Sequence, residues 1–314
     1  MAPHVRTLAL AGFRSYARAR VVLPAGAAAL IGPNGAGKTN LLEALSLLSP
    51  GRGLRRAAAG EMARAGTTAG WRISARLATG TGEREIDLAA DPAGTRTLRI
   101  DGKAAAQSVL AGIVCILWLT PAMDRLWIEG AEGRRRFLDR LALSFTPGHG
   151  EAALTYEKAM RERNRLLREG RRDEAWMDAL EARMAEAGAR IAAARRTALS
   201  EIAAAMEGAG TDFPAARLEI AWPDAPPPEE AGALAEALAA GRSRDIAAGR
   251  SLTGPHRADL DATFAAKGLA ARRASTGEQK ALLISIILAN ARALSARSGA
   301  APILLLDEVA AHLD

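Results

Sequence analysis

The sequence contains a single cysteine, Cys115, and few aromatic side chains, which make up 4% of its 314 residues. One cysteine excludes a disulfide framework and any zinc site built from several cysteines, and it fits a reducing compartment. The scarcity of aromatic residues argues against a protein that stacks single-stranded bases on aromatic platforms. The longest apolar runs, residues 112–119 and 281–289, fall short of the ~18–20 residues of a membrane span. We therefore expect a cytoplasmic protein with no membrane partner.

Lysine is also scarce, so most of the positive charge is carried by arginine. Only five of the 42 Lys and Arg residues are lysines, and the net charge is +7. Residues 1–76 contain eleven basic residues against two acidic ones, and residues 130–172 contain eleven against six. Because arginine makes bidentate contacts with phosphate, this pattern favours a polyanionic partner such as nucleic acid. The alternative is an ordinary solvated basic surface in an arginine-rich chain.

Hydrophobic patterns predict a mixed α/β N-terminal part. Residues 5–10 and 27–31 are predicted strands, the second buried and leading into a glycine-rich turn, and residues 40–48 form the helix that follows. Alternation over residues 71–77, 84–88 and 96–100 predicts an antiparallel meander, with a turn at Asp101 and Gly102. Residues 109–119 are predicted as a buried strand or helix.

From residue 151 onward, the residue pattern changes to long helix-forming stretches without proline. Residues 151–169 and 173–207 are predicted helices, joined by a turn at residues 170–172. In the second helix, apolar residues recur at alternating steps of three and four, which is typical of a coiled-coil-like hairpin. These seam residues are Met177, Leu180, Met184, Ala187, Ile191, Ala194, Ala198 and Ile202. We therefore predict a discontinuous head, residues 1–125 and 251–314, with an inserted helical arm, residues 126–250.

A phosphate-binding loop is predicted at residues 32–39, whose sequence GPNGAGKT fits the Walker A pattern between a strand and a helix. Glycines allow the backbone amides to surround a phosphate at a helix N-terminus. Lys38 is expected to reach the β- and γ-phosphates, and the Thr39 hydroxyl to bind Mg²⁺. The predicted ATP-binding residues are Gly32, Pro33, Asn34, Gly35, Ala36, Gly37, Lys38, Thr39 and Asn40.

An apolar strand near the C-terminus ends in two carboxylates, Asp307 and Glu308. Asp307 is suited to holding Mg²⁺, and Glu308 to activating water as a general base, so Lys38 and Glu308 are the predicted catalytic residues. Taken alone, the pattern describes any strand with a solvated end. Combined with the Walker A loop, it predicts a Walker B motif.

Between these motifs, residues 275–279 (STGEQ) begin a predicted helix. A serine and a glycine at a helix start are often only a cap. Their position before the Walker B strand, however, resembles the signature motif of ABC-type ATPases, which contacts the nucleotide of a second subunit. The resemblance implies nucleotide contacts from Ser275, Gly277 and Glu278 and a head-to-head homodimer, with residues 311–314 as the D-loop crossing its interface.

Four segments carry a resemblance over the whole chain: residues 12–16 (GFRSY), 119–121 (LTP), 133–139 (GRRRFLD) and 254–260 (GPHRADL). In this order they resemble the RecF family, bacterial recombination mediators related to SMC-type heads. The resemblance implies an α/β fold, with an ABC-type P-loop ATPase head, an antiparallel meander and an inserted α-helical arm, and it places Arg14 near the nucleotide. It also implies a weak, DNA-stimulated ATPase that forms ATP-dependent dimers on duplex DNA near single-strand gaps or junctions. The implied partners are RecR and RecO, with which it helps to load RecA.

The first candidates for contact with DNA are three arginines after the Walker A helix, Arg52, Arg55 and Arg56, on a face where related heads carry DNA. Arg134 and Arg135 are expected to divide their roles between packing at the base of the arm and phosphate contact. Ordinary solvated arginines are the alternative.

The sequence departs from the family pattern in two places. The family usually has an acidic residue directly after the Thr-Pro pair, where this chain has Ala122, so no Q-loop residue is assigned. The chain also stops at Asp314, where the family continues, so we expect a C-terminally shortened sequence. His149 is predicted to lie at the surface, and His256 to hold a loop or contact DNA.

Two other classes share these motifs. The ATPase subunit of an ABC transporter is disfavoured because its helical insertion between Lys38 and Gly277 would be smaller. A non-catalytic structural clamp of the SMC type would need arms longer than the two predicted helices.

Overall fold

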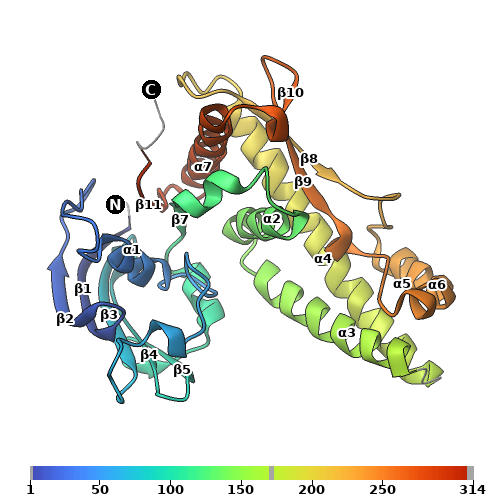
Figure 1. Cartoon of the computed structure of the whole chain (residues 1–314), viewed down its shortest axis with the longest axis horizontal. Helices are drawn as coiled ribbons and strands as arrows, with labels where there is room; N and C mark the ends of the chain where they lie inside the picture. Colours follow the sequence, from blue (N-terminus) through green and yellow to red (C-terminus); the bar gives the residue numbers. More distant parts are fainter. Residues whose placement is uncertain (1–2, 170–172, 310–314) are drawn as a thin grey trace. The chain divides into compact units, whose positions relative to one another are not determined.

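The computed structural model describes residues 3–169 and 173–309 (Figure 1), so the predicted turn at 170–172 and the D-loop at 311–314 lie outside the described residues. The chain divides into two compact units, residues 1–123 with 291–314, and residues 124–290. The sequence instead assigned residues 251–290 to the head. They group with the helical unit because β9 (Asp259–Phe264) pairs along its whole length with β8 (Ala216–Ala221).

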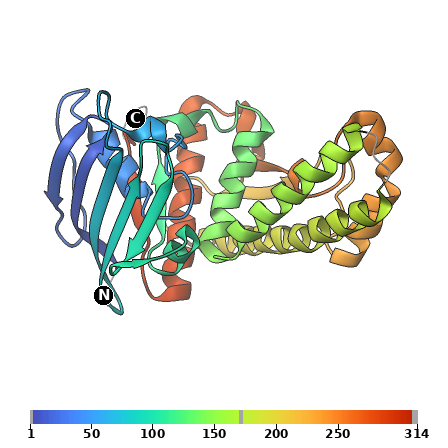
Figure 2. The same cartoon turned by 90° about the horizontal axis from the view of Figure 1, so that it is seen from below.

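The first unit contains a six-stranded sheet in the order β2-β1-β3-β4-β5-β6. Every neighbouring pair is antiparallel, and Figure 2 shows the strands side by side. The predicted meander is thus confirmed, while β2 was not foreseen. The strands are β1 (His4–Phe13), β2 (Tyr16–Val22), β3 (Trp71–Thr79), β4 (Gly82–Ala90), β5 (Arg96–Ile100) and β6 (Lys103–Ala104).

One hydrophobic core joins this sheet to α1 (Lys38–Ser46) and to a pair of parallel strands, β7 (Ile116–Leu119) and β11 (Ile303–Leu306). Ile73, Leu48 and Leu305 belong to this core. The predicted helix at 40–48 and the strand before Asp307 are confirmed. Residues 109–119 combine both predicted states, because the short 3-10 helix η2 (Gln107–Gly112) precedes β7. Two further 3-10 turns are η1 (Gly60–Met62) and η3 (Pro121–Arg125).

The predicted strand at residues 27–31 is wrong. No described strand pairs with these residues, and the side chain of Ile31 is 93% exposed. Residues 27–29 are alanines, which bury little apolar area, and a strand without a hydrogen-bonded neighbour is not stable in water. The Walker A loop therefore follows an irregular segment in this structure.

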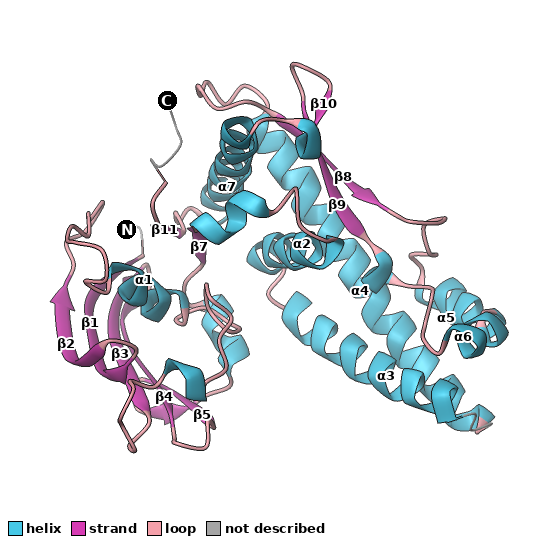
Figure 3. Ribbon diagram, viewed as in Figure 1, coloured by secondary structure: helices cyan, strands magenta, loops and turns pink. Residues whose placement is uncertain are grey.

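The second unit is mainly helical (Figure 3). Its long hairpin consists of α3 (His149–Glu169) and α4 (Glu174–Met206), and all eight predicted seam residues of α4 are buried. The hairpin packs with α2 (Ala131–Phe145) and α5 (Ala231–Ala240), and α6 (Arg242–Ala248) follows α5. A three-stranded antiparallel sheet has the order β10-β9-β8, with β10 at Leu269–Ala270. The connecting 3-10 turns are η4 (Pro255–Arg257) and η5 (Ala271–Arg273).

Helix α7 (Thr276–Ser298) contains the apolar run at 281–289 and is itself as long as a membrane span. Among the described residues it is the one helix long and apolar enough, with a mean hydropathy of 1.3 in its most apolar window. Because 56% of that window is buried inside the protein, and core helices of soluble proteins pass the same test, this is weak evidence for a span.

Candidate nucleotide-binding site

The Walker A loop leads directly into α1, and its backbone requires glycine. Gly37 precedes the helix with φ +97°, a left-handed conformation that side chains disfavour. A Cβ atom at Gly37 would also lie 2.5 Å from the Tyr16 hydroxyl oxygen, closer than van der Waals contact allows. Residues 32–36 are exposed, so the loop before α1 is accessible to an anion.

The side chain of Lys38 forms hydrogen bonds with the backbone of this loop. Its Nζ donates to the carbonyl oxygens of Gly32 at 2.7 Å and Pro33 at 3.0 Å. These bonds hold the ammonium group against the backbone of the loop that is predicted to bind the β- and γ-phosphates.

The two nucleotide motifs of the first unit meet at Thr39 and Asp307. The Thr39 hydroxyl donates to Asp307 Oδ1 at 3.3 Å, across 268 positions of sequence. Asp307 is placed by the parallel pairing of β11 with β7, which continues as a bond from its backbone N–H to the Leu119 oxygen at 2.9 Å. A hydroxyl and a carboxylate are hard oxygen donors of the kind Mg²⁺ prefers, so these residues fit the ion.

Glu308 follows directly in a left-handed conformation with φ +50°. Such a backbone is uncommon for a residue other than glycine, and backbone strain of this kind concentrates at functional sites. The conformation turns the chain at the end of β11, next to the predicted magnesium ligand.

Arg14 lies beside α1, but its guanidinium is taken up by protein groups. It makes two bonds to the fully buried Glu43, at 2.8 and 2.6 Å, and donates to the Glu61 carbonyl at 2.7 Å. Arg55 also reaches Glu43, at 3.2 Å, and bonds the Asn40 side chain at 2.7 Å. The expectation that Arg14 lies near the nucleotide stays a prediction; its guanidinium anchors α1, the helix that follows the Walker A loop.

The signature-like segment belongs to the second unit and forms a reciprocal cap on α7. The backbone N–H of Ser275 donates to Glu278 Oε2 at 2.8 Å, and the backbone N–H of Glu278 donates to Ser275 Oγ at 3.3 Å. Lys267 also bonds the Glu278 carboxylate, and this bond and the Ser275 backbone lower the pKa of Glu278 to about 2. Glu278 is therefore ionised at neutral pH.

Apart from Arg55, which bonds Asn40 and Glu43, the arginines predicted to contact DNA fall into two groups. Arg52 and Arg56 are exposed, and the pKa of Arg96 is lowered first by its burial and then by the charge of Arg52, which marks a local concentration of positive charge. Arg134 instead makes two 2.8 Å bonds to Asp259, which raise its pKa. Arg135 donates to the Ala258 carbonyl oxygen at 3.1 Å, so this second group packs the helical unit internally.

Sequence reasoning missed a buried polar network in the hairpin, and the surface position predicted for His149 is wrong. His149 is 3% exposed and bonds Asp139 at 3.0 Å. Arg163 is completely buried and is bonded to Glu181 and Asp245. The sequence did indicate the burial of Arg163, because this residue continues the helical spacing of Tyr156 and Ala159 on the buried face of α3.

A Walker A loop bonded to an acidic strand end, in a chain with an inserted helical hairpin, defines a class: an SMC-like, ABC-type ATPase. Comparison with known proteins identifies the family, since residues 4–314 match the RecF/RecN/SMC N-terminal domain. Two proteins named DNA replication and repair protein RecF are similar over nearly the whole chain. That of Mesorhizobium japonicum is 48% identical over 324 residues, covering 99% of this chain and 85% of that protein. That of Brucella suis is 50% identical over 321 residues, covering 99% and 84%. The chain belongs to the RecF family.

Solved structures support the fold. A structure described as the recombination mediator protein RecF with ATP superposes with a TM-score of 0.88 at 23% identity, covering all of this chain and 87% of that one. The Smc head domain of Pyrococcus furiosus gives a TM-score of 0.53 at 19% identity, covering 99% and 83%. The predicted fold class, an ATPase head with an antiparallel meander and an inserted helical arm, is confirmed.

Proposed function

We propose that this chain binds ATP at residues 32–40 and uses it to join two copies head to head around duplex DNA during repair in the cytoplasm. The observation that carries the proposal is the 3.3 Å contact between Thr39 and Asp307. It brings a phosphate loop and an acidic strand end into one site, as ATP hydrolysis with Mg²⁺ requires.

Each predicted site residue of the first unit has a role in the binding or hydrolysis of ATP. Lys38 exchanges its two bonds to loop carbonyls for bonds to the β- and γ-phosphates. Thr39 and Asp307 hold Mg²⁺, which when bound neutralises charge on the phosphate oxygens. Glu308 accepts a proton from the attacking water as a general base. Arg14, through Glu43, keeps α1 in position beneath the loop.

The second unit supplies contacts to the nucleotide of the other copy. Ser275 and Gly277 stand at the start of α7, where the helix dipole favours an anion. The negative charge of Glu278 is balanced there by Lys267. Each site is therefore complete only in a dimer, and hydrolysis separates the two copies.

DNA is the polyanion that the arginine-rich composition favours, with Arg52 and Arg56 as the contacts in the first unit. The relatives' names place those proteins in DNA replication and repair. We therefore infer a duplex target at single-strand gaps or junctions, and action with RecR and RecO to help load RecA.

The test measures binding to a labelled gapped duplex with and without ATP and Mg²⁺, while sedimentation reports dimers. We expect ATP to promote both dimers and DNA retention. Lys38→Met should abolish both effects because the phosphates lose their cation. Glu308→Gln should make the dimers and their DNA complexes persist, because hydrolysis stops.

Matched controls carry the same substitutions at exposed positions outside the site, Lys103→Met on β6 and Glu207→Gln after α4. Both should behave as the unmodified protein. If ATP binds but changes neither the dimer fraction nor DNA affinity in any variant, the clamp is refuted.

A further inference from the structure

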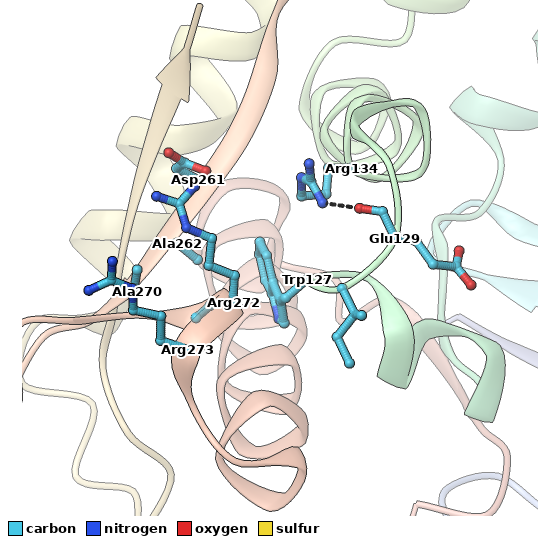
Figure 4. Close-up of a pocket in the computed structure, with 10 residues that line it drawn as sticks. Trp127, Glu129, Arg134, Asp261, Ala262, Ala270, Arg272 and Arg273 are labelled. Carbon is cyan, nitrogen blue, oxygen red and sulfur yellow. Dashed lines mark hydrogen bonds between the residues drawn. The ribbon is translucent and has the colours of Figure 1, made fainter.

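A cavity of about 420 Å³ lies within the helical unit, and none of the residues discussed for nucleotide binding lines it (Figure 4). Three segments form it: residues 127–129, the first turn of α2, and the chain from β9 to η5. Arg134 fixes one wall, since it bonds the Glu129 carbonyl oxygen while its other nitrogens bond Asp259. One wall of the cavity is therefore fixed by a partly exposed ion pair between Arg134 and Asp259.

The floor of this cavity is apolar and made of small residues. Ala262 and Ala271 are buried, and the side chain of Trp127 lies between Arg272 and Glu129 in Figure 4. Trp127 is 5% exposed, and its indole N–H has no acceptor among the described residues. A buried indole N–H usually finds an acceptor, so the floor is suited to an apolar side chain accompanied by a carbonyl oxygen.

The rim carries an excess of positive charge. Arg272 and Arg273 are exposed, and neither has an ion-pair partner within 4.0 Å in the part of the chain that the structure describes. Glu129 is paired with Arg125 at 3.4 Å, and Asp261, toward which Arg272 extends in Figure 4, adds one negative charge. Two guanidinium groups against one carboxylate favour a ligand that carries carboxylates of its own.

One side of the cavity follows a strand edge that no described strand occupies. β9 pairs with β8 over residues 259–264, but β10 pairs only with Thr263 and Phe264. Asp261 and Ala262, which line the cavity, therefore have a strand neighbour on one side, and on the other side η5 contacts β9 without pairing with it as a strand. Extended peptides add to strand edges of this kind, with main-chain bonds for affinity and pockets for alternate side chains.

We propose that this cavity binds an extended acidic segment of a partner protein. An apolar side chain of that segment enters the alanine floor beside Trp127, and flanking carboxylates pair with Arg272 and Arg273. Duplex DNA fits less well, because the Asp261 carboxylate repels phosphate and a cavity of this volume admits a side chain but not a nucleic-acid backbone. Because η5 leads directly to Ser275, the occupant lies on the turn that precedes α7.

The experiment measures anisotropy of a fluorescein-labelled, aspartate-rich peptide with one phenylalanine, titrated with the full chain in the absence of ATP and DNA. Arg272→Glu with Arg273→Glu should weaken binding about tenfold or more, because attraction becomes repulsion. Ala270→Leu, which fills the cavity without changing charge, should weaken it as well. Arg18→Glu with Arg20→Glu, on the exposed side of β2, should leave it unchanged.

Three outcomes would overturn the proposal. The peptide fails to bind, or a version with alanine in place of phenylalanine binds equally well, or the double variant at Arg272 and Arg273 weakens binding of duplex DNA but not of peptide. Since no nucleotide is present, failure here is distinguishable from failure of the ATP-dependent clamp.

Discussion

Arg163 is a guanidinium with no solvent exposure in the middle of α3. It bonds Glu181 at 3.0 Å, Asp245 at 2.6 Å, the Ser251 hydroxyl at 2.8 Å and the Leu238 carbonyl at 3.0 Å. Burying a charge is unfavourable unless every polar atom is satisfied, so these four groups specify how α3, α4 and α6 meet.

Replacing Arg163 by methionine keeps the volume but leaves the carboxylate of Asp245 buried without its cation. We expect a loss of about 3–5 kcal/mol in the free energy of unfolding, measured by urea titration. Arg165→Met is the matched control on the same helix: its partner Glu162, 2.6 Å away, is partly exposed, and the expected loss is below about 1 kcal/mol. Equal losses in the two variants would show that burial of the ion pair has no special role.

His256 leads to a prediction about how the stability of the protein depends on pH. Its Nε2 lies 3.0 Å from the Ser251 carbonyl oxygen, which only accepts, so Nε2 carries the proton and Nδ1 accepts from the Tyr156 hydroxyl at 2.7 Å. This neutral form is maintained because burial lowers the pKa of His256 from 6.5 to about 4.

Since the unfolded chain takes up this proton at higher pH than the folded one, His256 does not reduce stability above pH 6.5. Its destabilising effect grows as the pH falls from 6.5 to 4. His256→Gln keeps the donor to Ser251 without the titration. We measure the free energy of unfolding of both proteins by urea titration at several pH values. As the pH falls over this range, the value for the variant should rise relative to that of the unmodified protein by up to about 3 kcal/mol. A difference independent of pH would contradict the assignment.

At the scale of elements, periodicity was the most informative signal. The α4 seam, the meander and the helix after the Walker A loop were all predictable, because each buries one face at a regular spacing. The strand at 27–31 was not, since strand formation depends on a neighbour that local sequence does not reveal. Likewise the bond of Arg14 to Glu43 could not be predicted, because the two residues lie 29 positions apart in the sequence.

The start of α4 depends on a single cap, Asp173, whose side chain accepts from the Trp176 backbone N–H at 3.0 Å. Asp173→Ala removes this acceptor from the first turn and should cost about 1 kcal/mol, with faster amide hydrogen exchange at Trp176. Asp173→Asn retains a capping oxygen and should exchange at nearly the original rate. Unchanged exchange in the alanine variant would mean that the hairpin packing alone holds the turn.

At the scale of the whole molecule, the arginines divide into those that stabilise a unit internally and those whose charge is available to a ligand. The net charge of +7 gives little information until the arginines are sorted by environment. Arg134 and Arg163 stabilise the helical unit through carboxylates. Arg52 and Arg56 remain exposed, so their charge is available to a polyanion.

Salt dependence of DNA binding tests this division. Each phosphate contact releases counterions, so Arg52→Ala should lower the slope of log affinity against log salt by about 1 and weaken binding to all duplex sequences alike. Arg217→Ala, at an exposed position on β8, should leave the slope unchanged. The slope is measured with gapped duplex over a range of salt concentrations in the presence of ATP. An identical slope for the Arg52 variant and the unmodified protein would remove Arg52 from the DNA-binding surface, leaving only other arginines as its phosphate contacts.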